Sequence, residues 1–554
     1  MKQVLIVNIT RMGDLVQMGA LLARLREEWP GVAVDLVVDR QFAPVASMLS
    51  GLRDILAYDF HALIDESRAC VKDTVALYRE VAAWAGNLHE RRYDRIINLT
   101  FNRPSALLAD YVGAPDIRGA RSAWDGGTVI DNPWMAYFTD IHQIRRINRF
   151  NLVDVYALAG SGPGSFAPLH VTAPAESGDW AQRFLSNPNR PDAKWIAVQA
   201  GASDVMKAWR PQHFGETLAR FSARWNGGIL FVGSASEQET VAHVIRTYRE
   251  AGGRCSIKNA VGQTTLAQLT ALLARCWLLL TNDTGPMHLA VGVQTPVIDL
   301  SVGHVDFQET GPYGTGHWVV QPDLECAPCG FDQVCPHHAC KDRLPIDSIV
   351  EVMRHVVGEG PLPLVAPGYR LYRSGIDEDQ LGCFQLVSGR EDPVIAWYAA
   401  FWRRRWYTSF TGQPSRLPVL NGLPPDTREA SACIGAMVPL LDTLCQRADH
   451  IVTLIGQAPI PVQAVQSLQR TQAEDRQKVA MAGTATWATK PVTTAALRLL
   501  HQDNVQGLEQ MARHHAAAYH RWRREIGIVA SRLASVSETV NPSPIVPASY
   551  AGIR

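Results

Sequence analysis

The most distinctive polar segment of the chain is Thr281-Asn282-Asp283-Thr284-Gly285-Pro286-Met287-His288, which directly follows an apolar run ending at Leu280. A strand, a short polar loop with glycine and the start of a helix form a phosphate-binding arrangement, because the first N–H groups of the helix point outward. Asp283 and Thr284 could hydrogen-bond a sugar or ribose hydroxyl, and His288 lies one turn further on. The alternative is a capped helix with a buried histidine.

Two further segments carry charged residues after apolar runs. Lys207 follows the small residues that come after Gln199, and it could place a positive charge on a leaving phosphate, with Arg210 as a second candidate. A solvated loop lysine is the alternative. Glu237 and Glu239 follow Val232-Gly233-Ser234 and could accept ribose hydroxyls, or they could be acids in the first turn of a helix.

Near the start of the chain, Gly13-Asp14 comes shortly after the apolar run Val4-Leu5-Ile6-Val7. In an open α/β domain, ligands bind outside the carboxyl ends of the strands, so this loop is expected at a cleft. Asp14 could direct its carboxylate at a bound hydroxyl. It could equally cap the helix that follows.

Four cysteines, Cys326, Cys329, Cys335 and Cys340, fall within fifteen positions. Such spacing in a cytosolic protein is typical of a metal site, and four thiolates suit zinc or iron. His337 and His338 are reserve ligands. We expect such a site to be structural, because the protein fills all four positions; an ordinary reduced loop is the alternative.

Composition limits the class of protein. The 554 residues are 47% hydrophobic and 19% charged, with 53 basic and 53 acidic residues. This is the composition of a folded protein, and the balanced charge offers no general field for nucleic acid. The ten cysteines are too few for a disulfide scaffold in so long a chain. Neither a spanning apolar run nor a signal peptide is recognised, so we expect a cytoplasmic, multidomain protein.

These segments sit in two series of apolar runs that alternate with helical patterns. Strands are expected at 4–7, 32–38 and 95–99, and a helix at 15–29. A second series begins near residue 194, with strands at 195–199, 228–232, 277–280 and 296–300, and a Gly-, Pro- and Ser-rich stretch, 160–189, reads as a linker. The pattern predicts two Rossmann-like α/β domains facing a cleft, over residues 1–175 and 190–357, the second carrying the cysteine-rich loop 326–340.

After about Gly368 no strand pattern is recognised, and the sequence favours an α-helical module over residues 370–540 followed by a flexible tail, 541–554. Asp377-Glu378-Asp379 is interpreted as surface charge. The segment Trp397 to Tyr407 combines aromatic residues with three arginines, and it could dock on an anionic membrane surface or on acceptor phosphates. An aromatic core with a solvated arginine edge is the alternative.

Taken together, residues 1–357 resemble the heptosyltransferases of glycosyltransferase family 9. The resemblance is carried by Gly13-Asp14, Lys207-x-Trp209, Asp283-Thr284-Gly285-Pro286-x-His288 with Thr295-Pro296-Val297, and Gly311-Pro312-Tyr313-Gly314. It implies a GT-B fold, inverting transfer without a catalytic metal, and an ADP-heptose donor bound mainly to the second domain. In GT-B proteins a C-terminal helix often returns to the first domain, and 346–357 is the candidate here.

The resemblance also implies roles for individual residues. Asp14 matches the proposed general base, and Lys207, Asp283, Thr284, Gly285 and His288 match donor-binding residues. The donor glutamate maps to Glu237, with Glu239 as a competitor. One branch of the family, which modifies autotransporter proteins, has an iron site made by cysteines in a comparable place. The helical region after Gly368 lies outside the resemblance.

The expected partners are therefore an ADP-activated sugar and a saccharide or protein acceptor, with peripheral association at the inner face of the membrane as a further expectation. Two other classes remain open at this stage. One is a non-catalytic nucleotide-sugar-binding or scaffold protein on a GT-B core. The other is an epimerase acting on nucleotide sugars, which would need a different arrangement of the donor site.

Overall fold

The computed structural model describes residues 1–60, 74–123, 127–130, 132–186, 194–330, 333–362, 368–501 and 507–535. The chain divides into two compact units. The first, the α/β unit, comprises residues 1–391 and 402–417, and the second, the helical unit, comprises 392–401 and 418–554. The flexible tail expected over 541–554 lies outside the described residues.

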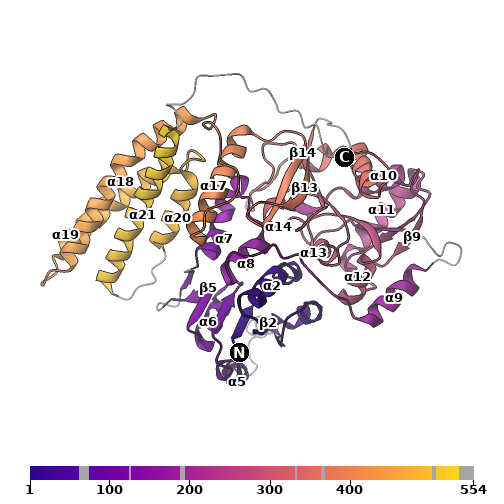
Figure 1. Ribbon diagram of the computed structural model, residues 1–554, viewed down its shortest axis with the longest axis horizontal. Coiled ribbons are helices and arrows are strands. Elements are labelled where there is room, and N and C mark those ends of the chain that lie inside the picture. The colour runs from indigo at the N-terminus through magenta and orange to yellow at the C-terminus, as the bar shows by residue number, and fades with distance from the viewer. Residues whose placement is uncertain are drawn as a thin grey trace. The chain divides into compact units, whose positions relative to one another are not determined.

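The α/β unit begins with a six-stranded sheet, which defines its first domain (Figure 1). The strand order is β3-β2-β1-β4-β5-β6, parallel except for β6. The central strand, β1, is an uninterrupted apolar run because both faces of the sheet are covered. The strands are β1 (Gln3–Val7), β2 (Ala33–Asp39), β3 (Asp54–Tyr58), β4 (Arg95–Asn98), β5 (Asp116–Ser122) and β6 (Thr128–Ile130).

Helices pack on this sheet. Leu5 and Val7 of β1 share a core with α5 and α6, whereas Gly160 at the end of α8 lies close to Ile97 and Leu21. The single helix expected over 15–29 is two helices, α1 and α2, which meet at Met18. The main helices are α1 (Met12–Gln17), α2 (Gly19–Glu28), α5 (Thr74–Glu90), α6 (Arg103–Val112), α7 (Pro133–Ile144) and α8 (Leu152–Gly160).

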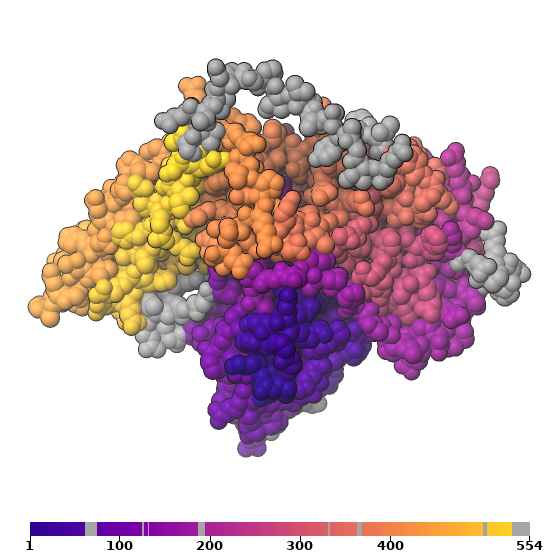
Figure 2. Space-filling model, in the orientation of Figure 1, coloured from indigo at the N-terminus to yellow at the C-terminus, as the bar shows by residue number. Residues whose placement is uncertain are grey.

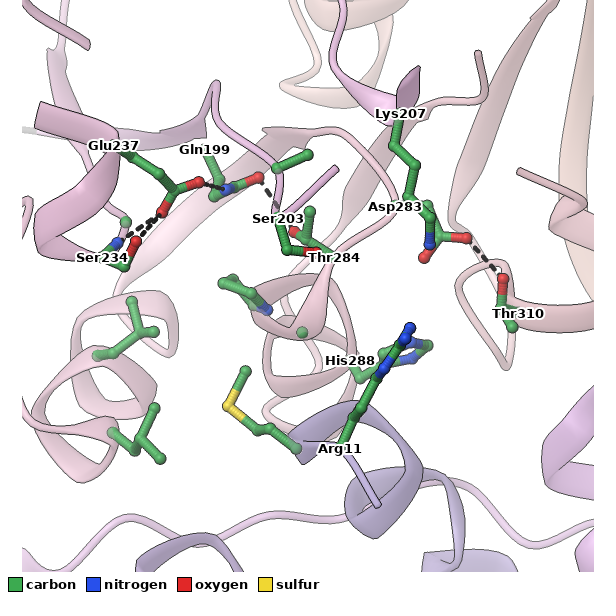
Figure 3. A pocket seen from close by; sticks show the side chains of 18 of the residues that line it. Arg11, Gln199, Ser203, Lys207, Ser234, Glu237, Asp283, Thr284, His288 and Thr310 are labelled. Atoms are coloured by element: carbon green, nitrogen blue, oxygen red, sulfur yellow. Dashed lines mark hydrogen bonds between the residues drawn. The ribbon is translucent and has the colours of Figure 1, made fainter. Parts of the chain in front are cut away.

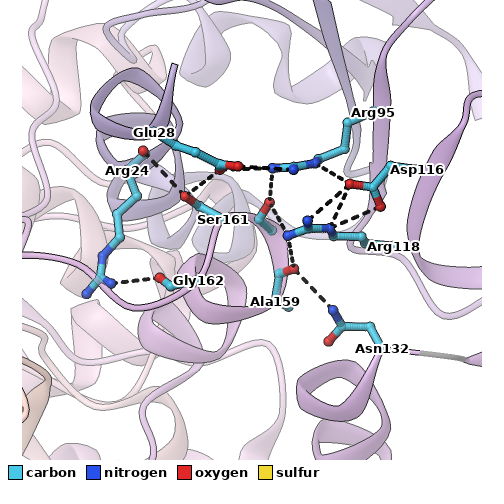
Figure 4. Close-up of polar contacts among 10 residues, drawn as sticks. Arg24, Glu28, Arg95, Asp116, Arg118, Asn132, Ala159, Ser161 and Gly162 are labelled. Carbon is cyan, nitrogen blue, oxygen red and sulfur yellow. Dashed lines mark hydrogen bonds and ion pairs between the residues drawn. The ribbon is translucent and has the colours of Figure 1, made fainter. Parts of the chain in front are cut away.

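Three arginines hold the end of α8, where the connection to the second domain begins. The side chains of Arg95 and Arg118 each donate a 3.0 Å hydrogen bond to the carbonyl oxygen of Gly160, and Arg24 donates one of 2.8 Å to that of Gly162 (Figure 4). The last carbonyl groups of a helix lack partners within the helix, and cations there also interact favourably with its dipole. The start of the connection is therefore fixed rather than loose.

The second domain is built on an eight-stranded sheet of order β14-β13-β12-β11-β10-β7-β8-β9. Its strands are β7 (Trp195–Gln199), β8 (Gly228–Phe231), β9 (Ser256–Asn259), β10 (Cys276–Thr281), β11 (Val297–Leu300), β12 (Trp318–Pro322), β13 (Tyr369–Ile376) and β14 (Gly382–Ser388). The main helices are α9 (Ala175–Leu185), α10 (Pro211–Ser222), α11 (Gln238–Glu250), α12 (Leu266–Leu273), α13 (Gly285–Gly292) and α16 (Ile346–Val356). The prediction of two Rossmann-like domains is confirmed.

The expectation of helices alone after Gly368 is wrong. Strands β13 and β14 form a hairpin that pairs antiparallel with β12 and extends the second sheet. Of the acidic segment after β13, interpreted as surface charge, Glu378 is exposed, but the two aspartates are not. Asp379 is buried and Asp377 nearly so, and both form ion pairs with buried Arg403, at 3.4 and 2.6 Å. A buried arginine requires such partners, since an uncompensated charge is costly in the interior.

Two expectations about connections are corrected as well. The stretch 160–189 is not all linker, because α9 lies within it and packs on α12 of the second domain. Helix α16 does not return to the first domain: Ile349 and Met353 belong to the core of the second sheet, and the helix packs on α10.

The helix that returns is α17 (Pro393–Thr411), through its second half, which belongs to the α/β unit. There Trp406 packs on Tyr137 of α7, with ring centroids 4.7 Å apart, and Phe410 packs edge-on against Trp134. Arg403 lies 4.2 Å above the ring of Phe150. The aromatic segment is thus a packed core, and the one arginine of the three that enters it, Arg403, is ion-paired.

The part of the helical unit that the structure describes contains four further helices: α18 (Thr427–Ile455), α19 (Val462–Gly483), α20 (Lys490–His501) and α21 (Leu508–Ser535). Figure 2 shows α18 (orange) and α21 (yellow) side by side. An ion pair between Arg523 and Asp442, at 2.7 Å, and a hydrogen bond between His520 and Asp449, at 3.0 Å, join the two helices. Among the described residues, no helix has the length and apolar character needed to cross a membrane.

Candidate active site

A cleft of about 530 Å³ lies between the two domains of the α/β unit (Figure 3). The first domain contributes α1 and the residue before it, and the second domain contributes the loops at the carboxyl ends of β7, β8 and β10. All seven non-cysteine residues expected in the site line this cleft: Asp14, Lys207, Glu237, Asp283, Thr284, Gly285 and His288. Arg210 and Glu239 do not belong to its lining.

On the first domain, Asp14 has the two features that the sequence left as alternatives. Its carboxylate accepts a hydrogen bond of 3.3 Å from the backbone N–H of Arg11, so it helps to cap α1. Its side chain nevertheless remains partly exposed at the cleft, where a bound hydroxyl could reach it. Capping therefore holds the carboxylate in place without removing it from the site.

The two domains meet closely at two glycines. A Cβ atom on Gly13 would lie 2.9 Å from Cδ2 of His288, and a Cβ atom on Gly285 would lie 2.0 Å from Cε of Met12. Neither space admits a side chain without movement. The absence of side chains at these positions lets the start of α1 approach the start of α13, and so it brings Asp14 opposite the donor-side loop.

Within the second domain, the octet 281–288, at the end of β10, is hydrogen-bonded to the loop that follows β7. Asn282 is buried; its side-chain oxygen accepts from the N–H of Trp209, at 2.9 Å, and its amide donates to the carbonyl oxygens of Ala200 and Gly201. Trp209 is itself fully buried. The motif Lys207-x-Trp209 and the octet are thus parts of one structure, and the tryptophan anchors the lysine's segment.

A polar chain runs along one wall of the cleft. Thr284 donates to the side-chain oxygen of Gln199, at 3.0 Å, and the amide of Gln199 donates to Glu237, at 2.7 Å. Glu237 also accepts from the N–H of Ser234, at 2.6 Å. The carboxylate is held by these bonds at the start of the 3-10 turn 235–237, which leads into α11. It faces the cleft as a fixed hydrogen-bond acceptor.

Lys207 ends a short 3-10 turn, Val205–Lys207, whose first N–H groups are capped by Asp204. Nearby, Asp283 accepts a hydrogen bond of 2.5 Å from Thr310. Lys207 and Arg11 are the cations of the described lining, facing the carboxylates of Asp14, Glu237 and Asp283. Figure 3 shows Lys207 on the Asp283 side of the cleft.

Burial lowers the pKa of His288, which favours the neutral imidazole, and none of the described residues hydrogen-bonds its Nδ1 atom. The sequence left open whether this histidine is buried or belongs to a binding site. Both hold: His288 is buried, and it also lines the cleft. A neutral imidazole can accept or donate one hydrogen bond to a ligand, but it adds no charge there.

Three further carboxylates, Asp299, Asp306 and Glu309, lie buried behind the cleft. Burial raises the pKa of each: well above the ordinary value for Asp299, to about 6 for Asp306 and to about 7 for Glu309. Asp306 and Glu309 lie within 4 Å of Arg145 of the first domain. Sequence reasoning missed them, as it missed Thr310, although Thr310 directly precedes the Gly-Pro-Tyr-Gly motif.

The cysteine-rich loop lies apart from the described lining of the cleft. Burial raises the pKa of Cys329 to about 11, and the nearby thiols of Cys326, Cys340 and Cys335 add smaller contributions in the same direction. Among the described residues, however, no three His, Cys, Asp or Glu side chains stand in position to hold one metal ion.

The α/β unit has two domains with a cleft between them, and residues 81–339 match the model of glycosyltransferase family 9 (heptosyltransferase). The match covers a little less than half of the chain, and it does not include the helical region that follows.

Among the relatives, lipooligosaccharide heptosyltransferase 2 of Campylobacter jejuni is 28% identical over 168 residues, which are 30% of this chain and 51% of that protein. The chain thus spans about half the length of this relative. Lipopolysaccharide heptosyltransferase 2 of Escherichia coli is 22% identical over 316 residues, 54% of this chain and 82% of that protein.

Among solved structures, the glycosyl transferase family 9 protein of Veillonella parvula aligns with a TM-score of 0.51 at 20% identity. The alignment covers 65% of this chain and 98% of that one. At this identity the likeness shows that the two proteins share a fold.

Proposed function

We propose that this protein is an inverting glycosyltransferase that moves a heptose or a similar sugar from an ADP-sugar to a hydroxyl group of a saccharide or protein. The observation that carries the proposal is the placement of Asp14 on the first domain, across one cleft from Lys207 and the start of α13 on the second. The family match and the heptosyltransferase relatives support the same reaction class.

The second domain offers a distinct surface for each part of the donor. Glu237 would accept hydrogen bonds from the ribose hydroxyls, because Ser234 and Gln199 hold its carboxylate at the cleft. Leu266 and Leu269 give an apolar wall for the base. The diphosphate would lie at the start of α13, where Thr284 and Gly285 present backbone N–H groups, with Lys207 beside it.

Transfer then takes one displacement. The acceptor hydroxyl attacks the anomeric carbon on the face opposite the diphosphate, and Asp14 takes its proton. The bond between the anomeric carbon and the diphosphate oxygen breaks, and ADP leaves with the electron pair. Because attack and departure occur on opposite faces, the anomeric configuration inverts. Lys207 and the α13 dipole stabilise the charge that develops on the leaving group.

We propose further that this step needs no divalent cation, since Lys207 and the start of α13 stabilise the negative charge on the departing diphosphate. Chromatographic measurement of ADP release from ADP-heptose, with saccharide and protein acceptors supplied in turn, tests the function. Release that depends on an acceptor and persists in EDTA, with an inverted anomeric signal in the product's NMR spectrum, is expected. ADP binding without transfer to any acceptor would favour a nucleotide-sugar-binding scaffold instead.

The cysteines carry a separate, structural proposal. We propose that Cys326, Cys329, Cys335 and Cys340 bind one zinc or iron ion, for which their sulfur atoms must turn toward a common point. Support comes from their mutual proximity around Cys329. Elemental analysis of protein purified without chelator is expected to give one ion per chain, lost when Cys329 and Cys340 are both replaced by serine. A metal-free protein of unchanged thermal stability would contradict it.

We place the reaction in the cytoplasm. The cysteines among the described residues form no disulfide bonds, although four of them are neighbours in one loop. Free thiols in such a loop suit a reducing compartment. Binding of the purified protein to anionic vesicles, compared with neutral ones, tests the expected association with the membrane face.

A further inference from the structure

The turn that carries Lys207 is held by two consecutive residues of α15 (Ala339–Arg343), the short helix that begins at the end of the cysteine-rich loop. Lys341, the residue after Cys340, donates a hydrogen bond from its Nζ atom to the carbonyl oxygen of Val205, at the start of the turn. Asp342 forms an ion pair with Arg210, which begins α10 three residues after Lys207. Lys341 and Asp342 therefore hold the segment 205–210 at its two ends.

The same loop supports the turn from its inner side. The backbone N–H of Cys329 donates a 3.0 Å hydrogen bond to the carbonyl oxygen of Gly303. Gly303 in turn lies against the turn so closely that a Cβ atom there would be 2.1 Å from the carbonyl oxygen of Met206. A positive φ of 69° at Gly303 makes the close approach possible.

The turn needs this support because it is short and lies between strand and helix, without a place in the sheet. Its internal hydrogen bonds are the Asp204 cap and two backbone bonds, which the N–H groups of Lys207 and Ala208 donate to the carbonyl oxygens of Asp204 and Val205. A lysine side chain is a flexible four-carbon chain, so any movement of its backbone also moves its ammonium group. A displacement of about 1 Å in an active site can lower turnover about a hundredfold.

We infer that Lys341 is a positioning residue for Lys207, with Asp342 as a weaker second clamp, and that the cysteine-rich loop thereby contributes to donor binding without entering the cleft. This inference rests on the proposed role of Lys207 at the donor diphosphate. Asp342 is the weaker of the two because its ion pair with Arg210 is roughly half exposed, and exposed pairs contribute little.

A double-mutant cycle tests the inference. The variants are Lys341→Met, which keeps the apolar stem and removes the donor, Lys341→Arg, which restores a donor, Lys207→Ala, and the double variant. Arg343→Met is the matched control, because Arg343 lies on the same helix, α15 (Ala339–Arg343). Calorimetry gives the Kd for ADP, ADP release gives kcat and KM, and thermal unfolding shows that each variant is folded.

Lys341→Met is expected to weaken ADP binding and kcat/KM about tenfold, with at least half of the loss recovered in Lys341→Arg and no loss in Arg343→Met. In the Lys207→Ala background the same change should cost less than about twofold, because the residue it positions is gone. An undiminished effect in that background, or no effect in the wild-type background, would overturn the inference.

The ADP measurements separate this inference from the proposed function. If the protein binds ADP but transfers no sugar, the glycosyltransferase proposal fails, and the cycle on the Kd still decides the role of Lys341. If Lys207→Ala leaves both the Kd and kcat unchanged, Lys207 has no part in donor binding, and the inference about Lys341 falls with it.

Discussion

Tyr313 of the second domain donates a hydrogen bond of 2.7 Å to Asp154 of the first, and both side chains are almost completely buried. The other carboxylate oxygen of Asp154 accepts from the N–H of Gly382, at 2.9 Å. The side chain of Asn151, one turn before Asp154 on α8, donates to the carbonyl oxygen of Gly311. The Gly-Pro-Tyr-Gly motif thus joins the domains, and it does not belong to the described lining of the cleft.

Replacing Tyr313 by phenylalanine should destabilise the α/β unit, because a buried carboxyl group loses a donor while the ring keeps its packing on Phe166. The expected loss is about 1–3 kcal/mol in the free energy of unfolding. Urea denaturation followed by tryptophan fluorescence measures it. An unchanged midpoint would show that the hydrogen bond contributes nothing between the domains. Phe166→Leu, which disturbs the ring packing but keeps the hydroxyl, is the companion variant.

Asp154 should also make stability depend on pH. Burial raises its pKa from 3.8 to about 7. Between these values the folded protein keeps a proton that the unfolded chain releases, so the free energy of unfolding falls as pH rises from about 4 to 7 and then levels off. The Asp154→Asn variant has no carboxyl group at this position, so its free energy of unfolding does not show this decrease. Its stability relative to the wild type should therefore rise by about 2 kcal/mol between pH 5 and pH 8.

Urea denaturation of both proteins at the two pH values checks this, since the other titrating groups are shared and cancel in the comparison. A difference between variant and wild type that stays constant, or shrinks as pH rises, would mean that Asp154 is already ionised in the folded protein at pH 5.

The two glutamates that the sequence could not separate give a matched pair of variants. Glu237 accepts hydrogen bonds from Gln199 and Ser234 and lines the cleft, whereas Glu239 does not belong to that lining. Glu237→Gln should weaken ADP binding about tenfold or more, the value of a hydrogen bond to a charged group. Glu239→Gln should leave it unchanged. Equal Kd values for the two variants, measured by calorimetry, would refute the ribose assignment.

The position at which the chain can be shortened follows from the strands after Gly368. A protein ending at Leu417 keeps β13, β14 and the second half of α17, and it should fold and bind ADP. A protein ending at Gly368 loses the hairpin on β12 and the partners of Trp134 and Tyr137, so it should be insoluble. A soluble, ADP-binding protein from the shorter chain would show that these elements are dispensable.

The site was more predictable from sequence than the edges of the fold. In a parallel sheet the loops after neighbouring strands meet at one edge, so the polar residues following Leu280 and Val232 had to converge. The residues after Val7 lie at the same edge of the other sheet, and they meet the first group because the two domains share the cleft. The hairpin β13–β14 was missed because β13 carries charged residues, Arg370 and Arg373, among its apolar ones and shows no clear alternation of apolar and polar positions.

Partnerships between distant residues are the other class of feature that was missed. Asp377 and Asp379 look like surface charge until Arg403, more than twenty positions away, is brought to them by the return of α17. The same holds for Asp154 and Tyr313, which are 159 positions apart. No local pattern marks such pairs, since each depends on the packing of whole elements.

The central claim is that Asp14 accepts the proton of the attacking hydroxyl while the second domain binds the donor. The most direct measurement compares wild type and Asp14→Asn for transfer from ADP-heptose and, separately, for ADP affinity. The amide keeps the shape of the carboxyl group and an oxygen that can still cap α1. We expect transfer to fall about 10²- to 10⁴-fold with the Kd for ADP unchanged. Transfer above about a tenth of the wild-type rate, with normal ADP binding, would contradict the assignment of Asp14 as the base.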